Sequence, residues 1–121
     1  MGIKIDDIKH FPLPLDVRFI DGRMWELLAP FEYHRDSGEV IRVFPKFRFD
    51  FASIPKPFWS LIGSPTGRYG PAALIHDFLC EYALWPRAKT DRIFLEAMRD
   101  CKVPYLKRMI IYYAVRIWSY F

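Results

Sequence analysis

Hydrophobic and polar residues alternate in the first half of the chain. In the stretch EVIRVFPKFRF, residues 39–49, positions 40, 42, 44 and 46 would share one face of a strand, and positions 41, 43, 45 and 47 the other. Pro45 indicates an edge strand or a bulge, because proline has no N–H to donate to a strand ladder. The alternation therefore predicts β structure in this part of the chain.

Two turn signals divide this β region into hairpins. Asp21 and Gly22 separate two strand-like runs in DVRFIDGRMWELL. Such a pair favours a two-residue turn whose central residues have positive φ, which predicts a hairpin over residues 17–28. The polar segment RDSG, residues 35–38, separates two further runs and predicts a second hairpin.

The second half of the chain has the spacing of helices. A short helix is expected in ASIPKPFWSLIG, residues 52–63, with Ser53 as its N-cap and prolines in its first turn. Three longer helices are expected over residues 71–84, from 87 to about 101, and from 104 to the end. The fold class is therefore α+β: a small antiparallel hairpin sheet followed by three to four helices.

The length of the chain fits one domain. We expect residues 1–121 to form it, with a β part at about 15–50 and a helical part at about 54–121. With 52% hydrophobic and 18% aromatic residues, the chain can fill a dense core, so a disordered protein is excluded.

Charge and hydropathy narrow the classes of partner. The net charge of +4 is spread along the chain without a nucleic-acid motif, so no specific nucleic-acid partner is expected. The apolar run MIIYYAVRIWSYF has 13 residues and is interrupted by Arg116, whereas a membrane span needs about 20 residues. We therefore expect a soluble protein without a transmembrane segment.

Four ionisable residues break the apolar pattern: Asp50, His76, Asp77 and Asp91. His76 and Asp77 are adjacent within an apolar helix, and Asp91, near the start of the next helix, can reach back toward His76. In a catalytic interpretation His76 is a general base, Asp91 orients it, and Asp77 with Asp50 binds a metal ion. One imidazole with carboxylates suits calcium, magnesium or manganese better than zinc, so a divalent cation is the candidate cofactor.

A purely structural role for the His-Asp pair is as well supported by the sequence as a catalytic one. The same groups would form a hydrogen-bonded polar network between the helices and the sheet, since an unpaired buried carboxylate is too costly to persist. Ser53 is then an ordinary helix cap rather than a nucleophile. The sequence leaves both interpretations of the His-Asp pair open.

The local pattern HD followed by TDRIF is similar to a phospholipase-A2-type site. That resemblance implies His76 as base, Asp91 as its orienting carboxylate and calcium on Asp77. A glycine-rich calcium loop and helix-clamping disulfides have no clear counterpart in this chain. The HD-type metallophosphohydrolases share only the dipeptide, because they need a further helical histidine, and His10 and His34 fall in loop or strand here.

Aromatic residues near the C-terminus follow helical spacing. We expect Tyr113, Trp118 and Phe121 to form a partner interface if the last helix is not fully covered, because an exposed apolar patch usually marks a protein-protein contact. The expected partners are other structural proteins of an assembly or further copies of the chain.

Three motifs in order, FDFASIP, GRYGPAALIHDFL and TDRIFLEAM, resemble the phage-associated family catalogued as domain of unknown function 1353. The shared pattern is an Asp-x-Ala-Ser-x-Pro segment, a Tyr-Gly before an Ala-Ala and His-Asp helix, and an Asp-x-x-Phe segment. It falls on Asp50, Ala52, Ser53, Pro55, Tyr69, Gly70, Ala72, Ala73, His76, Asp77, Asp91 and Phe94. Cys80 stands where members of that family commonly have tyrosine, so no role of that hydroxyl carries over.

The resemblance implies a bacteriophage or prophage origin. Our leading hypothesis is a small phage-encoded virion or tail component of a larger assembly, located in the virion or in the host cytoplasm during infection. The alternative is a metal-assisted hydrolase that acts on lipid or the cell envelope.

Overall fold

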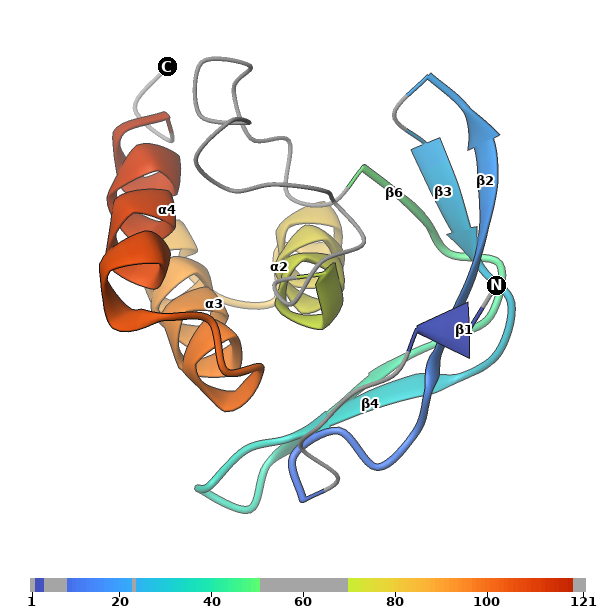
Figure 1. Cartoon of the computed structure of the whole chain (residues 1–121), viewed down its shortest axis with the longest axis horizontal. Helices are drawn as coiled ribbons and strands as arrows, with labels where there is room; N and C mark the ends of the chain where they lie inside the picture. The colour runs from blue at the N-terminus through green and yellow to red at the C-terminus, as the bar shows by residue number, and fades with distance from the viewer. Residues whose placement is uncertain (1, 4–8, 23, 51–69, 119–121) are drawn as a thin grey trace. The chain divides into compact units, whose positions relative to one another are not determined.

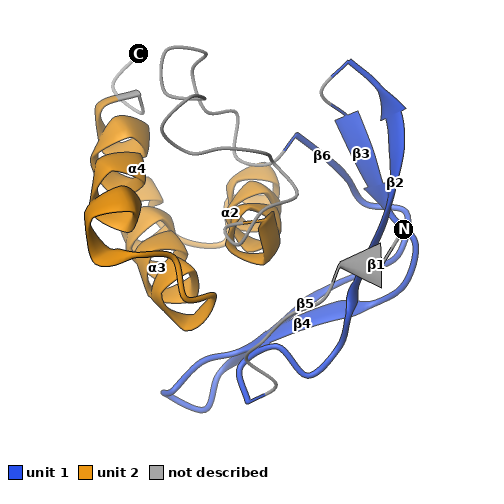
Figure 2. Cartoon of the chain, in the orientation of Figure 1, with its two compact units in different colours: residues 1–50 blue, residues 51–121 orange. Residues whose placement is uncertain are grey.

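The computed structural model describes residues 2–3, 9–22, 24–50 and 70–118. The chain divides into two compact units, residues 1–50 and 51–121 (Figure 2). The boundary between the units falls where the expected β part gives way to the expected helical part. The predicted short helix at 52–63, with Ser53, lies outside the described residues.

The first unit is built from antiparallel strands (Figure 1). Four strands pair in the order β1 (Gly2–Ile3), β2 (Leu15–Asp21), β3 (Met24–Leu27) and β6 (Arg48–Phe49). A separate two-stranded sheet consists of β4 (Phe31–His34) and β5 (Val40–Val43).

Both predicted hairpins are confirmed. Strands β2 and β3 pair with Val17 opposite Leu27. Gly22 has the expected positive φ, 52°, whereas Asp21, expected as the other turn residue, ends β2 opposite Met24 without a positive φ. Strands β4 and β5 pair with Glu32 opposite Arg42, and Gly38 in the second turn has a φ of 94°. Glycine suits both turns because it adopts positive φ without steric cost.

The run over residues 39–49 is two strands rather than one. Alternation holds for Ile41, Val43 and Phe47, which are all buried. However, β5 ends at Val43, and Pro45 lies in a turn with Lys46, whose φ is 72°. After this turn β6 pairs with β3, so the proline ends a strand.

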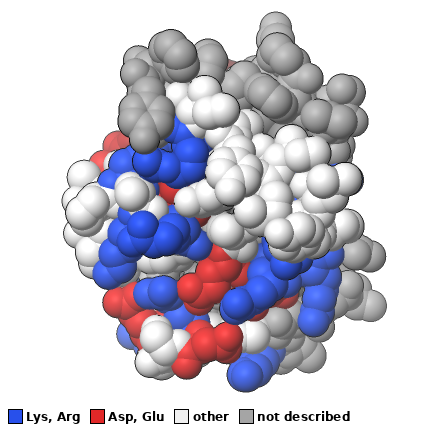
Figure 3. Space-filling view, turned by 90° about the vertical axis from the view of Figure 1, so that its left-hand side faces the viewer, with Lys and Arg blue, Asp and Glu red and all other residues white. Residues whose placement is uncertain are grey.

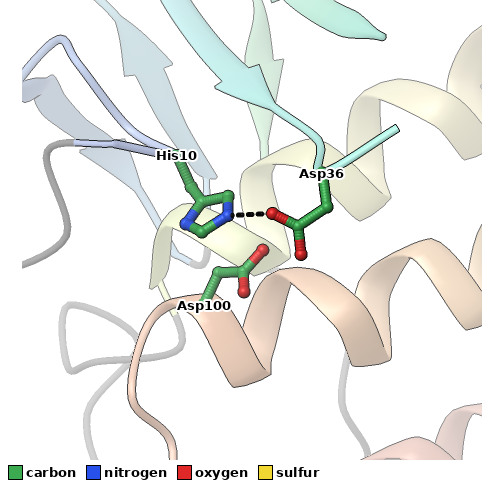
Figure 4. Close-up of side chains that lie close together, drawn as sticks. All are labelled: His10, Asp36 and Asp100. Atoms are coloured by element: carbon green, nitrogen blue, oxygen red, sulfur yellow. Dashed lines mark hydrogen bonds and ion pairs between the residues drawn. The ribbon is translucent and has the colours of Figure 1, made fainter. Parts of the chain in front are cut away.

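Aromatic rings fill the core of the first unit, and ion pairs lie on its surface. The Phe11 ring stacks on Tyr33 with centroids 4.9 Å apart. On the surface Glu26 accepts hydrogen bonds from Arg18 and Arg48. His10 Nε2 lies 2.7 Å from a carboxylate oxygen of Asp36 (Figure 4). The Arg18–Glu26 and Glu26–Arg48 pairs join residues that lie opposite each other on neighbouring strands, as expected of a sheet with one solvated face.

Three helices form the described part of the second unit: α2 (Gly70–Tyr82), α3 (Arg87–Asp100) and α4 (Tyr105–Trp118). The three longer helices predicted from the sequence are thereby confirmed. Pro71 lies in the first turn of α2, while Pro86 and Pro104 directly precede α3 and α4. Proline is tolerated there because the first helical N–H groups have no partner within the helix.

Helix α3 ends in a Schellman-type arrangement. Val103 N–H donates to the Met98 carbonyl, and Lys102 N–H donates to that of Arg99. Lys102 has a φ of 66°, the left-handed conformation that this motif requires. The reversal allows α4 to pack beside α3 (Figure 1).

The helical core includes most of α2, the apolar face predicted for α3 and one face of α4. Ile93, Phe94, Ala97 and Met98 are at most 1% exposed, and Ile111 and Val115 of α4 are buried as well. None of the described helices is both long enough and apolar enough to span a membrane.

Candidate functional site

Asp91 is the centre of a polar cluster inside the helical unit. Its side chain is fully buried and comes from the second turn of α3. His76 Nε2 of α2 lies 2.7 Å from Asp91 Oδ1. Arg87 Nε donates to the same oxygen at 2.9 Å, and Arg116 Nη1 of α4 donates to Oδ2 at 2.8 Å. We call His76, Arg87, Asp91 and Arg116 the Asp91 cluster; it links all three helices.

Local spacing explains part of this arrangement. Arg87 and Asp91 are four residues apart on α3, which brings side chains onto one face of a helix. The Arg87 and Arg116 side chains remain 42% and 22% exposed, so each guanidinium reaches a buried carboxylate while keeping contact with solvent.

The environment of Asp91 favours the ionised carboxylate. Burial raises the pKa of this carboxyl, but hydrogen bonds from His76, Arg87 and Arg116 outweigh burial and lower the pKa from 3.8 to about 2. Asp91 is therefore a carboxylate at neutral pH. Because a carboxylate only accepts hydrogen bonds, His76 Nε2 must carry the proton and donate it.

The His76 ring is enclosed by α2 and α3. The residue is 2% exposed, its Nδ1 atom is buried, and the ring lies 4.6 Å from the Phe94 ring between centroids. The predicted contact between Asp91 and His76 is thus present. A general base must reach the proton that it abstracts, and this degree of burial limits such access.

Cys80 lies one helical turn from His76 without forming a catalytic relay. Its Sγ is 3.7 Å from His76 Nε2, the same nitrogen that donates to Asp91. In a Cys-His-Asp relay the thiol and the carboxylate contact opposite ring nitrogens. Although Cys80 as a residue is exposed, burial of its thiol raises its pKa to about 11, which disfavours the nucleophilic thiolate.

The two expected metal ligands, Asp77 and Asp50, belong to different units of the chain. Asp77 is half-buried on α2, next to His76, and Asp50 is half-buried at the end of the first unit. Within the described segments, no trio of His, Cys, Asp or Glu ligand atoms within 4.8 Å of one another includes His76, Asp77 or Asp91. A metal role for Asp77 and Asp50 stays a prediction.

Two members of the Asp91 cluster were not predicted. The i, i+4 spacing of Arg87 and Asp91 is a signal that could have identified Arg87. Arg116 interrupts the apolar pattern of α4, which also marks it as a residue that needs a partner. That this partner is Asp91, 25 positions earlier, is visible only in the folded chain.

Of the expected interface residues, Tyr113 is 56% exposed on α4. The Trp118 side chain and Phe121 lie outside the described residues.

On the face shown in Figure 3, Lys and Arg side chains lie next to uncharged surface, with Asp and Glu side chains among them. The cations on that face therefore do not form an uninterrupted basic stripe.

Comparison with known proteins places these residues in a family. Residues 25–115, which include His76, Arg87 and Asp91, match the family described as "Protein of unknown function (DUF1353)". The chain is also 38% identical over 106 residues to the uncharacterized protein y4jT of Sinorhizobium fredii. That match covers 84% of this chain but 32% of the relative, so the chain spans about a third of the relative's length.

No solved structure matches the chain. The family resemblance that the sequence motifs indicated is confirmed, whereas a phage origin stays a prediction. Because the family match extends over three quarters of the chain, from the first hairpin into α4, the protein belongs to the DUF1353 family.

Proposed function

We propose that this protein is a bacteriophage-encoded component of a larger assembly, associated with the virion or its tail, and that it works by docking rather than by catalysis. The observation that carries the proposal is the apolar surface of α4. Leu106, Tyr113 and Ile117 are 72%, 56% and 60% exposed. Exposed apolar patches of this kind usually mark contact sites for other proteins.

The Asp91 cluster supports this proposal. Both carboxylate oxygens of Asp91 accept hydrogen bonds, and the donors come from α2, α3 and α4. A carboxylate surrounded in this way is suited to holding helices in a fixed arrangement. In the proposed function the cluster keeps the helical unit rigid and α4 provides the contact surface.

Particle association tests the proposal. We expect a tagged form of the chain, produced during phage growth, to comigrate with purified particles through a density gradient. Tyr113→Gln and Leu106→Gln should each reduce incorporation at least tenfold at unchanged expression. Leu84→Gln is the matched control, because Leu84 is an exposed apolar residue outside α4. A chain that stays at the top of the gradient would contradict the proposal.

A metal-assisted hydrolase is the second candidate. It is favoured by the 2.7 Å contact between His76 and Asp91, which resembles the base and orienting carboxylate of a hydrolytic site. In this function Asp77 would hold a calcium, magnesium or manganese ion and the substrate would be a lipid or an envelope component.

Thermal unfolding with added cations tests this candidate. If Asp77 binds a metal ion, the unfolding midpoint of the wild-type protein rises with one of these cations and that of Asp77→Asn does not, because a ligand of the native state stabilises it. Glu81→Gln, on the same helix, controls for the lost negative charge. From the docking proposal we expect no cation-dependent difference between Asp77→Asn and Glu81→Gln, and no lipid hydrolysis.

A further inference from the structure

Two arginines of the Asp91 cluster share one acceptor. Arg87 Nε of α3 donates to Asp91 Oδ1, and Arg116 Nη1 of α4 donates to Asp91 Oδ2. Asp91 is fully buried, whereas the two arginine side chains remain 42% and 22% exposed. One buried carboxylate therefore holds two guanidinium groups side by side at the surface of the helical unit.

The contact with Asp91 uses only a small part of the donor capacity of Arg87. A guanidinium has five N–H donors in a planar fork, and a carboxylate often binds two of them at once. Here each oxygen of Asp91 accepts from a different arginine. Within the described residues Arg87 donates through Nε alone, so its two Nη groups are available to a further acceptor.

The Asp91 cluster has more positive than negative charge. The guanidinium groups of Arg87 and Arg116 are always protonated, and Asp91 supplies one negative charge between them. A carboxylate outside the cluster opposes this excess: Asp77 of α2 lies close enough to raise the pKa of the Cys80 thiol, which Arg87 lowers. The cluster itself therefore favours an anionic ligand.

The start of α3 adds to this positive potential. No side chain caps the helix, and its first turn contains Arg87 and Lys89 but no acidic residue. The first N–H groups of a helix have no acceptor within it, and they carry the positive end of the helix dipole. Cations at this end are unfavourable by themselves, and an anion bound beside them would offset that cost.

We infer that Arg87 and Arg116 form a binding site for a phosphate group, with Asp91 as the residue that positions both guanidinium groups. A phosphate has enough oxygens to accept from both arginines, and arginine forks match its geometry. Both side chains keep contact with water, so binding is reversible, with a dissociation constant in the millimolar range for phosphate alone. The inference goes beyond the proposed function and does not depend on it.

A titration of the full chain with inorganic phosphate tests the inference. We expect the Nε–Hε resonance of Arg87 and the backbone N–H resonance of Ala88 to shift along a saturable curve in heteronuclear NMR. Sodium chloride at the same ionic strength is the control, because it screens charges without offering several oxygen acceptors. It should leave both resonances nearly unchanged.

Variants test which groups hold the phosphate. Arg87→Gln and Arg116→Gln should each weaken binding at least tenfold, since each removes one guanidinium. Arg87→Lys keeps the charge but not the planar fork, so it should bind several-fold more weakly than the wild-type protein. Arg92→Gln is the matched control, because Arg92 is an exposed arginine of the same helix outside the cluster. It should bind like the wild-type protein.

Removing the opposing carboxylate should have the reverse effect. Asp77→Asn is expected to tighten phosphate binding several-fold, because a negative charge near an anion site repels the ligand. Glu81→Gln removes a negative charge from the surface of the same helix and should change the affinity less. The same NMR titration measures both variants.

Two further ligands identify the source of the phosphate group. If vesicles of phosphatidylglycerol bind the wild-type protein and not Arg87→Gln, whereas vesicles of phosphatidylcholine bind neither, the phosphate belongs to an anionic lipid headgroup. If glycerol phosphate binds and the vesicles do not, it belongs to a small soluble compound. Both results support the same site.

Three results would overturn the inference. They are the lack of a saturable shift with phosphate, an equal shift with sodium chloride, and a loss of affinity in Arg92→Gln as large as that in Arg87→Gln. If Arg87→Gln does not fold, Arg87→Lys decides, because lysine can still pair with Asp91. Wild-type affinity in Arg87→Lys would then show that a general positive charge, and not the guanidinium pair, attracts the anion.

Discussion

Replacing Asp91 by alanine is expected to destabilise the helical unit by roughly 3 to 5 kcal/mol, the range seen when one partner of a buried ion pair is removed. The substitution leaves the buried His76 ring and the guanidinium of Arg116 without their acceptor. It also removes a carboxylate that accepts hydrogen bonds from side chains of both α2 and α4. Denaturant unfolding followed by circular dichroism at 222 nm measures the effect, because this signal reports the helices.

The matched control for this experiment is Glu81→Gln. Glu81 is an exposed carboxylate on α2, so its replacement removes the same negative charge without opening the cluster. Its effect should stay below about 1 kcal/mol, as for other surface charges. A loss of stability in Asp91→Ala no larger than that of the control would show that the cluster does not hold the helices together.

Acid is expected to remove the contribution of the Asp91 carboxylate between about pH 4 and pH 2. The pKa of this group is lowered from 3.8 to about 2 in the folded state, so the folded protein binds the proton less readily than the unfolded chain. The resulting stabilisation is fully present above the unfolded-state pKa and is lost as the pH falls through the folded-state pKa. A shift of this size corresponds to about 2 kcal/mol above pH 5 and to about half of that at pH 3.

The comparison of wild type with Asp91→Asn isolates this contribution. Asparagine keeps the shape of the side chain and cannot titrate, so the difference in unfolding free energy between the two proteins should shrink as the pH falls. Effects of acid on other carboxylates are common to both proteins and cancel. A difference that stays constant from pH 7 to pH 3 would mean that the charge of Asp91 does not stabilise the fold.

The two experiments also bear on the choice between docking and hydrolysis. If the Asp91 cluster is structural, His76→Ala should lower stability without affecting any turnover, because His76 is a donor to a buried carboxylate. In a hydrolase the same substitution would abolish activity in a protein that remains folded.

Much of the fold could be predicted from local pattern. The turns at Gly22 and Gly38 and the prolines before α3 and α4 act through a few neighbouring residues, so their effect is readable along the chain. The path after Val43 was harder to predict. Alternation continues through residue 47, but pairing of β6 with β3 turns the chain at Pro45.

The candidate site could be predicted only in part. The contact between His76 and Asp91 followed from placing two polar residues on neighbouring apolar helices, where each needs a partner. The position of Cys80 Sγ against the proton-bearing nitrogen of His76 could not be derived in this way, because it depends on side-chain rotamers as well as on spacing.

The sequence by itself determined the fold class, the two hairpins and the three helices, because turn chemistry and hydrophobic period are local properties. Only the tertiary structure decided which polar groups surround Asp91 and which face of α4 remains exposed. Arg116 meets Asp91 across 25 positions because α3 and α4 pack together. Helix α4 is apolar on nearly all sides, so its pattern alone could not distinguish Ile111, which is buried, from Ile117, which faces solvent.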